Sequence, residues 1–457
     1  MLRPSANNHF VHLAQGWLDG RLELEGKPPG WCAHKNKRGG CVHRFDDYAR
    51  LWTLERRDGE GEPFRAYPCK TDACAERKRA DGVERWYVVG EGWRDFERRE
   101  LRKVKNGESW HITFPPGPAL LMLPFVALFG LATLDVALTV LAGALIPALL
   151  VVFLDRERGV QDGRGIAHLC AAAAFSLASP ALWLAANGQV WFTAQIFCAL
   201  FIVLFLLAGF GGRYPALAGL CLGIAVACRP TGALPAILVF GVWWLRNGRP
   251  IPAAVRFAVT LGACGVAVSL YNYVRFGDMF EFGHRFLEIR WQGRIQETGL
   301  FSLEYVARNL RCMFSLLPVS DPKVPWRVSI HGSALWVGAP WIVAAAFARR
   351  RFDGRLALWV SVMIAAAVGL LYQNSGQLQY SYRFAVDWLP LVVVAITLGG
   401  GMDPRGRGWR DWRSAWLPVL VLAGAVFQGW GAYYFERSKG KIFVTQPMGW
   451  PFEEELK

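Results

Sequence analysis

Three arginines of this chain are the best candidates for anion binding, because each stands beside apolar sequence. They are Arg229, Arg285 and Arg383. An arginine at membrane depth usually faces a partner or a water-filled cavity, and its planar guanidinium group can donate two hydrogen bonds to a phosphate. We therefore expect these cations, with the neighbouring His284 and Tyr382, to bind a group such as a lipid phosphate. Alternatively, Arg229 lies at the end of a helix and extends its side chain to the membrane interface. His284 and Arg285 could likewise belong to an ordinary surface helix without a ligand.

Three side chains of the N-terminal region could act as a general base. Asp46 and Asp47 are adjacent carboxylates, and His9 carries an imidazole, a group that ordinarily titrates near neutral pH. The aspartate pair could equally be a solvated turn or helix start, and His9 an ordinary loop histidine. We expect the base to be one of the three.

Four cysteines occur in the first 116 residues, outside the apolar segments: Cys32, Cys41, Cys69 and Cys74. In an oxidising compartment they could form two disulfides. Free thiols are one alternative. Zinc binding with His34 and His43 is the other, but the spacing matches no common zinc finger, and we expect no metal site.

Long apolar segments must position these side chains. Hydrophobic residues make up 53% of the chain, and they concentrate after the prolines at 115–118. The hydrocarbon core of a membrane is about 30 Å thick, so the longest of these segments could cross it as helices. We predict an all-α polytopic membrane protein with ten crossings, at about 133–154, 166–186, 190–212, 215–228, 231–246, 253–275, 333–348, 356–373, 386–402 and 415–433.

The distribution of positive charge predicts a topology. The net charge is +15, and basic residues fill short loops at 156–164, 213, 246–249, 349–355 and 405–413. Such loops normally face the cytoplasm, and this pattern argues against nucleic-acid binding. With ten crossings, residues 1–116 and the tail from 435 lie outside. Residues 1–116 then form an extracytoplasmic loop with a cysteine-bearing insert, 117–457 form the helical domain, and 276–332 form a second outer loop.

Two segments complete this arrangement. The apolar stretch 118–130 is too short to span, and we predict a helix in the outer leaflet, started by the preceding prolines. Segments 215–228 and 231–246 form a hairpin that places Arg229 at or below the outer surface. Because export normally requires an apolar segment upstream, we also expect one further helix before Met1.

The order of motifs along the chain resembles the GT-C superfamily of membrane glycosyltransferases. The closest branches are the protein O-mannosyltransferases and the aminoarabinose-lipid transferases, and the resemblance covers nearly the whole chain except the insert at about 30–80. The motifs are Asn8-His9-Phe10, Leu18-Asp19-Gly20-Arg21-Leu22, Phe114-Pro115-Pro116-Gly117-Pro118, Cys228-Arg229-Pro230-Thr231, Tyr271-Asn272 with Phe276-Gly277, and Tyr382-Arg383-Phe384.

The resemblance implies a cavity between helices, covered by the first outer loop and entered by a polyprenyl-phosphate sugar. It implies transfer with inversion, an acidic base in that loop, and arginines or lysines on the departing lipid phosphate. One feature departs from this pattern. The early part of the loop reads Ser5-Ala6-Asn7-Asn8-His9 and contains no acid.

We therefore expect a bacterial inner-membrane glycosyltransferase that needs no cofactor. It would move a sugar from an undecaprenyl- or dolichyl-type phosphate to a lipid, glycan or protein hydroxyl on the outer face. The sequence has no Walker loop, dinucleotide fingerprint, HExxH motif or nucleophile elbow. The alternatives are a binding protein or flippase for a lipid-linked sugar, an inactive relative of the transferases, and a structural membrane protein without a site.

Overall fold

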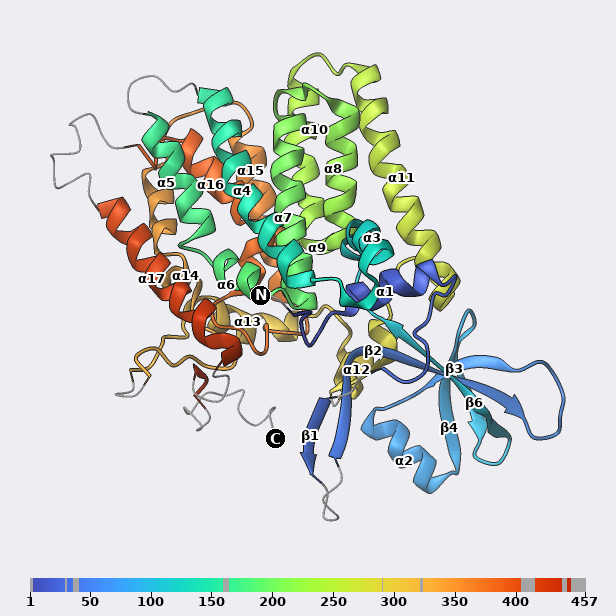
Figure 1. The fold of residues 1–457 in the computed structure, drawn as a ribbon. Coiled ribbons are helices and arrows are strands. Elements are labelled where there is room, and N and C mark those ends of the chain that lie inside the picture. Colours follow the sequence, from blue (N-terminus) through green and yellow to red (C-terminus); the bar gives the residue numbers. More distant parts are fainter. Residues whose placement is uncertain are drawn as a thin grey trace. The chain divides into compact units, whose positions relative to one another are not determined.

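The computed structural model describes residues 3–28, 31–35, 41–158, 164–289, 291–320, 324–403, 416–437 and 442–444. The chain divides into two compact units (Figure 1). The helical unit comprises Met1–Asn8, Leu134–Gly265 and Leu303–Lys457. The sheet unit comprises His9–Thr133 and Val266–Ser302.

The sheet unit is built on antiparallel strands. Its path runs β1-β2-β3-β4-β5, and β6 and β7 both pair with β2. The strands are β1 (Trp31–Lys35), β2 (Cys41–Arg56), β3 (Phe64–Pro68), β4 (Val83–Val88), β5 (Gly92–Glu97), β6 (Leu101–Ile112) and β7 (Leu287–Glu288). Its helical segments are α1 (His9–Leu18), α2 (Asp72–Ala80), α3 (Gly117–Phe129), η1 (Gly130–Ala132), η4 (His284–Phe286) and α12 (Gln292–Thr298).

The expectation of an all-α chain is wrong for this unit. Adjacent residues of β3 show why a sheet forms, because side chains of a strand alternate between its two faces. Tyr67 packs in a buried cluster with Leu51 and Phe286, whereas Ala66 packs in a second cluster with Leu54 and Trp86. The sheet thus buries apolar side chains on both faces.

A helix, α3, occupies the segment that we predict to lie in the outer leaflet. Pro118 stands in its first turn, where a missing backbone N–H is tolerated. Leu128 is 76% exposed, and Leu120, Phe125 and Phe129 are also exposed. A short helix with this much exposed apolar surface is suited to a membrane interface.

The helical unit contains helical residues in every one of the ten predicted segments. Helix α7 is its core, since most of its side chains are buried. The elements are α4 (Asp135–Arg158), α5 (Arg164–Ser176), α6 (Ala181–Asn187), α7 (Val190–Gly209), η2 (Phe210–Gly212), α8 (Pro215–Cys228), α9 (Pro230–Ala233), η3 (Leu234–Ala236), α10 (Ile237–Arg246), α11 (Ile251–Phe276, whose last turns belong to the sheet unit), η5 (Leu303–Tyr305), α13 (Val306–Phe314), α14 (Leu335–Gly338), η6 (Pro340–Phe347), α15 (Arg355–Leu371), η7 (Arg383–Asp387), α16 (Leu389–Leu398) and α17 (Trp416–Arg437).

In the described part of the chain, four helices are long and apolar enough to cross a membrane. They are Asp135–Arg158, Val190–Gly212, Ile251–Phe276 and Trp416–Phe435. A fifth is added if α5 and α6, which are bent by 54°, form one broken span. These helices indicate a helical membrane protein. The other predicted segments are shorter, and prolines interrupt two of them, at Pro235 and Pro340.

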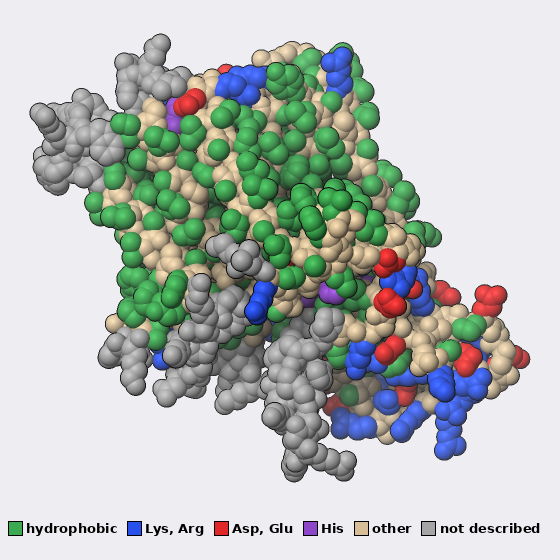
Figure 2. Space-filling view, in the orientation of Figure 1, with side chains coloured by type: hydrophobic (Ala, Val, Ile, Leu, Met, Phe, Trp, Pro, Cys, Tyr) green, Lys and Arg blue, Asp and Glu red, His purple; other side chains and the backbone are tan. Residues whose placement is uncertain are grey.

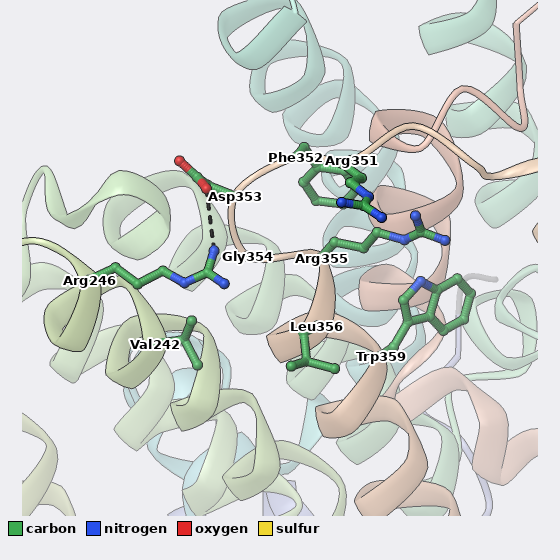
Figure 3. A pocket seen from close by; sticks show the side chains of 9 residues that line it. All are labelled: Val242, Arg246, Arg351, Phe352, Asp353, Gly354, Arg355, Leu356 and Trp359. Atoms are coloured by element: carbon green, nitrogen blue, oxygen red, sulfur yellow. Dashed lines mark hydrogen bonds and ion pairs between the residues drawn. The ribbon is translucent and has the colours of Figure 1, made fainter.

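The described residues of four predicted basic loops meet at one end of the helical unit, whereas the fifth loop, 405–413, lies outside the described part of the structure. Glu157 pairs with Arg213, and Asp403 pairs with Arg158 at 2.9 Å and with Arg350 at 2.8 Å. Arg246 pairs with Asp353 at 3.3 Å (Figure 3). Over this unit the visible face is largely hydrophobic, and Lys and Arg side chains lie toward its ends (Figure 2). The pairing of the basic loops is the arrangement expected of loops that share one side of a membrane.

Among the described side chains of the sheet unit, His111 is a strongly perturbed histidine. His111 of β6 is 1% exposed and packs edge-on against Phe276, with 5.4 Å between the ring centroids. Burial, together with the positive charges of Arg275 and Arg65, lowers the pKa of His111 to about 3. The imidazole is therefore neutral in the folded unit at physiological pH.

We expect the sheet unit to lose stability as the pH falls from about 6.5 toward about 3. The folded-state pKa lies below the unfolded value, so the unfolded chain gains the proton first. His111→Gln should remove about 2 kcal/mol of the loss between pH 6 and pH 4. The stability of the sheet unit at each pH can be measured by hydrogen exchange of the β2 and β6 amides, corrected for intrinsic exchange rates. Equal pH dependence in the variant and the wild type would contradict this role.

Candidate anion-binding site

Arg229 occupies the break between α8 and α9. Its backbone leaves the helical region, with φ −149° and ψ 84°, because Pro230 follows. The side chain is 20% exposed and pairs with Asp387 of η7, whose side chain is 5% exposed. The Arg229 Nη2 and Nε atoms both donate to Oδ2 of Asp387, at 3.0 Å and 3.2 Å. The arginine is thus paired but still accessible.

Arg229 and Arg383 lie against the same aromatic ring. The guanidinium carbon of Arg229 is 5.6 Å from the centre of the Phe384 ring, and that of Arg383 is 5.1 Å from it. Arg383 also lies 5.7 Å from the ring of Phe192 on α7. Phenyl faces attract cations, so the rings hold two like charges near each other. Two of the three predicted arginines are therefore brought together.

Buried amides fix the backbone that carries this site. Gln195 of α7 donates through Nε2 to the carbonyl oxygen of Arg383 at 2.8 Å and to Oδ1 of Asp387 at 3.5 Å. The Oε1 atom of Gln379 accepts from the Arg383 N–H at 3.0 Å. These contacts link η7 to α7 and to the segment before η7. The position of Asp387 is therefore set by several elements.

Tyr382, predicted as a hydrogen-bonding neighbour of the site, contacts it through its ring. Its ring centroid is 6.1 Å from that of Phe384, and its side chain is 2% exposed. Tyr372, which follows α15, approaches the same ring at 6.0 Å. We name Arg229, Arg383, Phe384 and Asp387 the arginine site.

In the sheet unit, the candidate bases His9 and Asp47 are both next to Tyr48, His9 by ring stacking and Asp47 in the chain. His9 is 4% exposed and stacks on the Tyr48 ring, with 4.6 Å between centroids. Asp47 has φ +73°, and its carbonyl oxygen accepts from Thr113 Oγ1 at 3.0 Å. A left-handed conformation is unusual outside glycine and is often found at functional sites. The side chain of Asp46 lies outside the described part of the structure.

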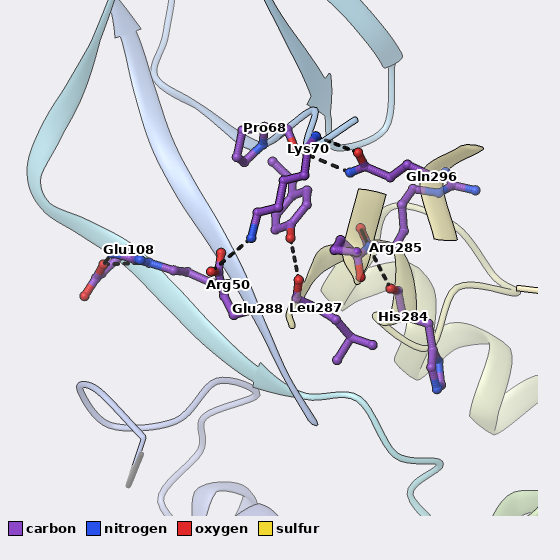
Figure 4. A network of polar contacts seen from close by, with 11 residues as sticks. Arg50, Pro68, Lys70, Glu108, His284, Arg285, Leu287, Glu288 and Gln296 are labelled. Carbon is purple, nitrogen blue, oxygen red and sulfur yellow. Dashed lines mark hydrogen bonds and ion pairs between the residues drawn. The ribbon is translucent and has the colours of Figure 1, made fainter. Parts of the chain in front are cut away.

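Arg285 and His284 belong to η4 of the sheet unit (Figure 4). The Arg285 Nε atom is 3.5 Å from the Glu281 carboxylate, and its guanidinium carbon is 4.6 Å from the centre of the Tyr87 ring. Gln292 donates to the carbonyl oxygens of His284 and Arg285, at 3.1 Å and 2.6 Å. These contacts hold η4 to the sheet and account for Arg285 without a ligand.

The cysteine prediction can be compared with the structure at one pair. Cys69 and Cys74 form a disulfide around the start of α2, where Thr71 caps the helix. The side chains of Cys32 and Cys41, and those of the histidines proposed with them as zinc ligands, lie outside the described part. Among the described residues, no group of three or more His, Cys, Asp or Glu side chains could hold a metal ion.

The sequence analysis did not select Asp387, Gln195 or Asp135. Asp387 and Gln195 both lie in predicted spans, where a polar side chain requires a partner, and this signal could have identified them. Asp135 begins α4 and accepts hydrogen bonds from the backbone N–H of Ser5, at 2.8 Å, and from its hydroxyl. The carboxylate of Asp135 thus lies beside the segment 5–9, which contains no acidic residue.

No protein-family model, characterised protein or solved structure matches the chain. What the chain does is therefore inferred from the chemistry of its sites. The arginine site combines two guanidinium groups with one carboxylate in apolar surroundings. It can accept a singly charged anion such as a phosphodiester or a lipid phosphate.

We expect the Arg229–Asp387 pair to stabilise the helical unit. Removing one partner leaves a largely buried charge, so Arg229→Ala and Asp387→Ala should each destabilise by about 3 kcal/mol. The double variant should lose less than the sum. The free energy of unfolding of each variant can be measured with a thiol-reactive dye. Cys198 and Cys228 are fully buried, so they react with the dye only when the helical unit unfolds. Additive losses would mean that the two side chains do not interact.

Proposed function

We propose that this chain is a membrane glycosyltransferase of the GT-C type. It would move a sugar from a polyprenyl-phosphate donor to an acceptor hydroxyl on the extracytoplasmic face. The observation that carries the proposal is the convergence of Arg229 and Arg383 on Phe384. Cleavage of the sugar–phosphate bond leaves a negative charge on the lipid phosphate, and fixed cations in a poorly solvated site stabilise that charge.

The two arginines differ in access. Arg229 keeps 20% of its side chain exposed, whereas Arg383 is 4% exposed. Arg229 would therefore contact the phosphate directly, and Arg383 would contribute its charge through the low-dielectric interior. Asp387 balances one positive charge when the site is empty. Nε and Nη2 of Arg229 both donate to Oδ2 of Asp387, so Nη1 is the nitrogen that would donate to the phosphate.

Asp47 is the better candidate for the base. His9 is buried and stacked on Tyr48, so its ring nitrogens have little access to an acceptor hydroxyl. Asp47 is only half-buried, and Thr113 holds its backbone in a conformation that few residues adopt. An aspartate fixed in this way can act as a general base.

The proposal includes the predicted topology of ten crossings. The end of the helical unit that carries the ion-paired basic loops would face the cytoplasm, and residues 1–116 would lie outside. In this arrangement the exposed apolar side chains of α3 enter the outer leaflet. The membrane would be a bacterial inner membrane, and the acceptor a lipid, glycan or protein.

A binding protein or flippase for a lipid-linked sugar is the second candidate. The segment 5–9 lacks the acid that the resemblance leads us to expect, and this observation favours a chain that holds the donor without cleaving it. Both candidates use the arginine site in the same way. They differ only in whether the sugar–phosphate bond breaks.

We expect proteoliposomes of the full chain to transfer label from polyprenyl-phosphate sugars to added acceptors. Arg229→Lys keeps the charge but loses planar donation, so transfer should fall about 10²-fold. Asp47→Asn should lower it by about 10² to 10⁴-fold. Arg94→Gln, an exposed arginine of β5, is the matched control and should be unchanged.

Two outcomes would contradict the transferase. If the wild type binds the donor in an Arg229-dependent manner but transfers nothing, the chain is a binding protein or flippase. If donor binding is insensitive to Arg229, the arginine site has a structural role only.

A further inference from the structure

A second positively charged site lies at the end of α10 and the start of α15 (Figure 3). It is a pocket of about 610 Å³ in the helical unit. Arg246 reaches into it from α10, and Arg351, Arg355 and Trp359 come from the loop before α15 and from the first turns of that helix. No part of the arginine site contributes to it.

The lining of the pocket combines cationic and apolar side chains (Figure 3). Arg246, Arg351 and Arg355 provide three positive charges against the single negative charge of Asp353. Val242 and Leu356 line the same space, together with the indole of Trp359 and the ring of Phe352. A ligand that matches this lining has an anionic group joined to an apolar chain.

The charges of the pocket are available to a ligand. The Arg246–Asp353 contact is 3.3 Å long, and its side chains are 58% and 101% exposed. Exposed ion pairs of this kind contribute little, so an incoming anion can replace Asp353. Arg355 is held more firmly, since it donates to the carbonyl oxygens of Ala348 at 2.9 Å and Arg349 at 3.2 Å.

The pocket lies at the far end of α15 from the arginine site. This helix has 17 residues between Arg355 and Leu371 and is therefore about 25 Å long. Tyr372 follows its last turn and contacts Phe384. In the predicted topology, where segment 356–373 crosses the membrane, the two sites would therefore serve opposite membrane surfaces. Arg246 and Arg350 also place the pocket at the end where the basic loops meet.

We propose that this pocket binds a phosphate group carried by an anionic phospholipid. The arginines hold the phosphate, Trp359 lies at the level of the interface, and the acyl chains follow Val242 and Leu356. The apolar side chains of the lining favour a lipid over free phosphate. The proposal does not depend on the transferase activity, because none of these residues belongs to the arginine site.

The test measures retention of labelled phosphatidylglycerol by the purified full chain in detergent micelles. The double variant Arg246→Gln/Arg351→Gln should retain at least fivefold less. Arg249→Gln, which removes a neighbouring exposed arginine outside the pocket, is the matched control and should retain as much as the wild type. Asp353→Asn should retain about twofold more, a gain that a misfolded variant would not show.

Three results would overturn the proposal. Equal loss in Arg249→Gln would indicate a diffuse electrostatic surface. Displacement of the lipid by millimolar glycerol phosphate would assign the site to a free phosphate compound. Retention that none of the variants changes would leave the pocket without a role in lipid binding.

Discussion

The pairing of Arg229 with Asp387 is the constraint on which the helical unit depends. Neither charge is tolerated alone among apolar helices, so the break at Pro230 and the short helix η7 must come together. The break at Pro230 and η7 pack closely at Gly232, where an added Cβ atom would lie only 2.5 Å from the Cβ of Asp387. Once the pair forms, the adjacent Phe384 lies beside both guanidinium groups, and Gln195 and Gln379 hold the backbone around it.

Charge in the helical unit is thereby separated into two places. Arginines with nearby carboxylates occupy one end, where water is accessible, and the arginine site occupies the other end of α15. The helix between them is apolar and about 25 Å long. A charged side chain must reach either water or a partner of opposite charge. This requirement explains both the ion-paired loops and the Arg229–Asp387 pair. Binding of phosphate at either end would use charges that the membrane fold already requires.

The sheet unit follows a different rule. Its strands join residues far apart in the chain, since β7 at Leu287 pairs with β2 and Tyr67 donates to the Leu287 carbonyl oxygen. From the sequence alone, residues 1–116 are predicted to form a loop with a cysteine-bearing insert. Alternation along one short strand is a weak signal, and the partners that bury each face are contributed by remote segments. A contact between distant residues also involves Asp47, whose carbonyl oxygen accepts a hydrogen bond from Thr113, 66 residues away.

By itself, the sequence determined where the apolar helices lie and which loops carry positive charge, because hydrophobic length and charge are properties of a local segment. Arg229, Arg383 and Tyr382 were likewise recognisable from their neighbours in the chain. Only the tertiary structure decided that Asp387 pairs with Arg229 across 158 residues, that Arg285 is held by Glu281 and Tyr87, and that a sheet forms at all. These features depend on which distant side chains become neighbours. The packing of the whole chain determines those neighbours, and the composition of a single segment does not.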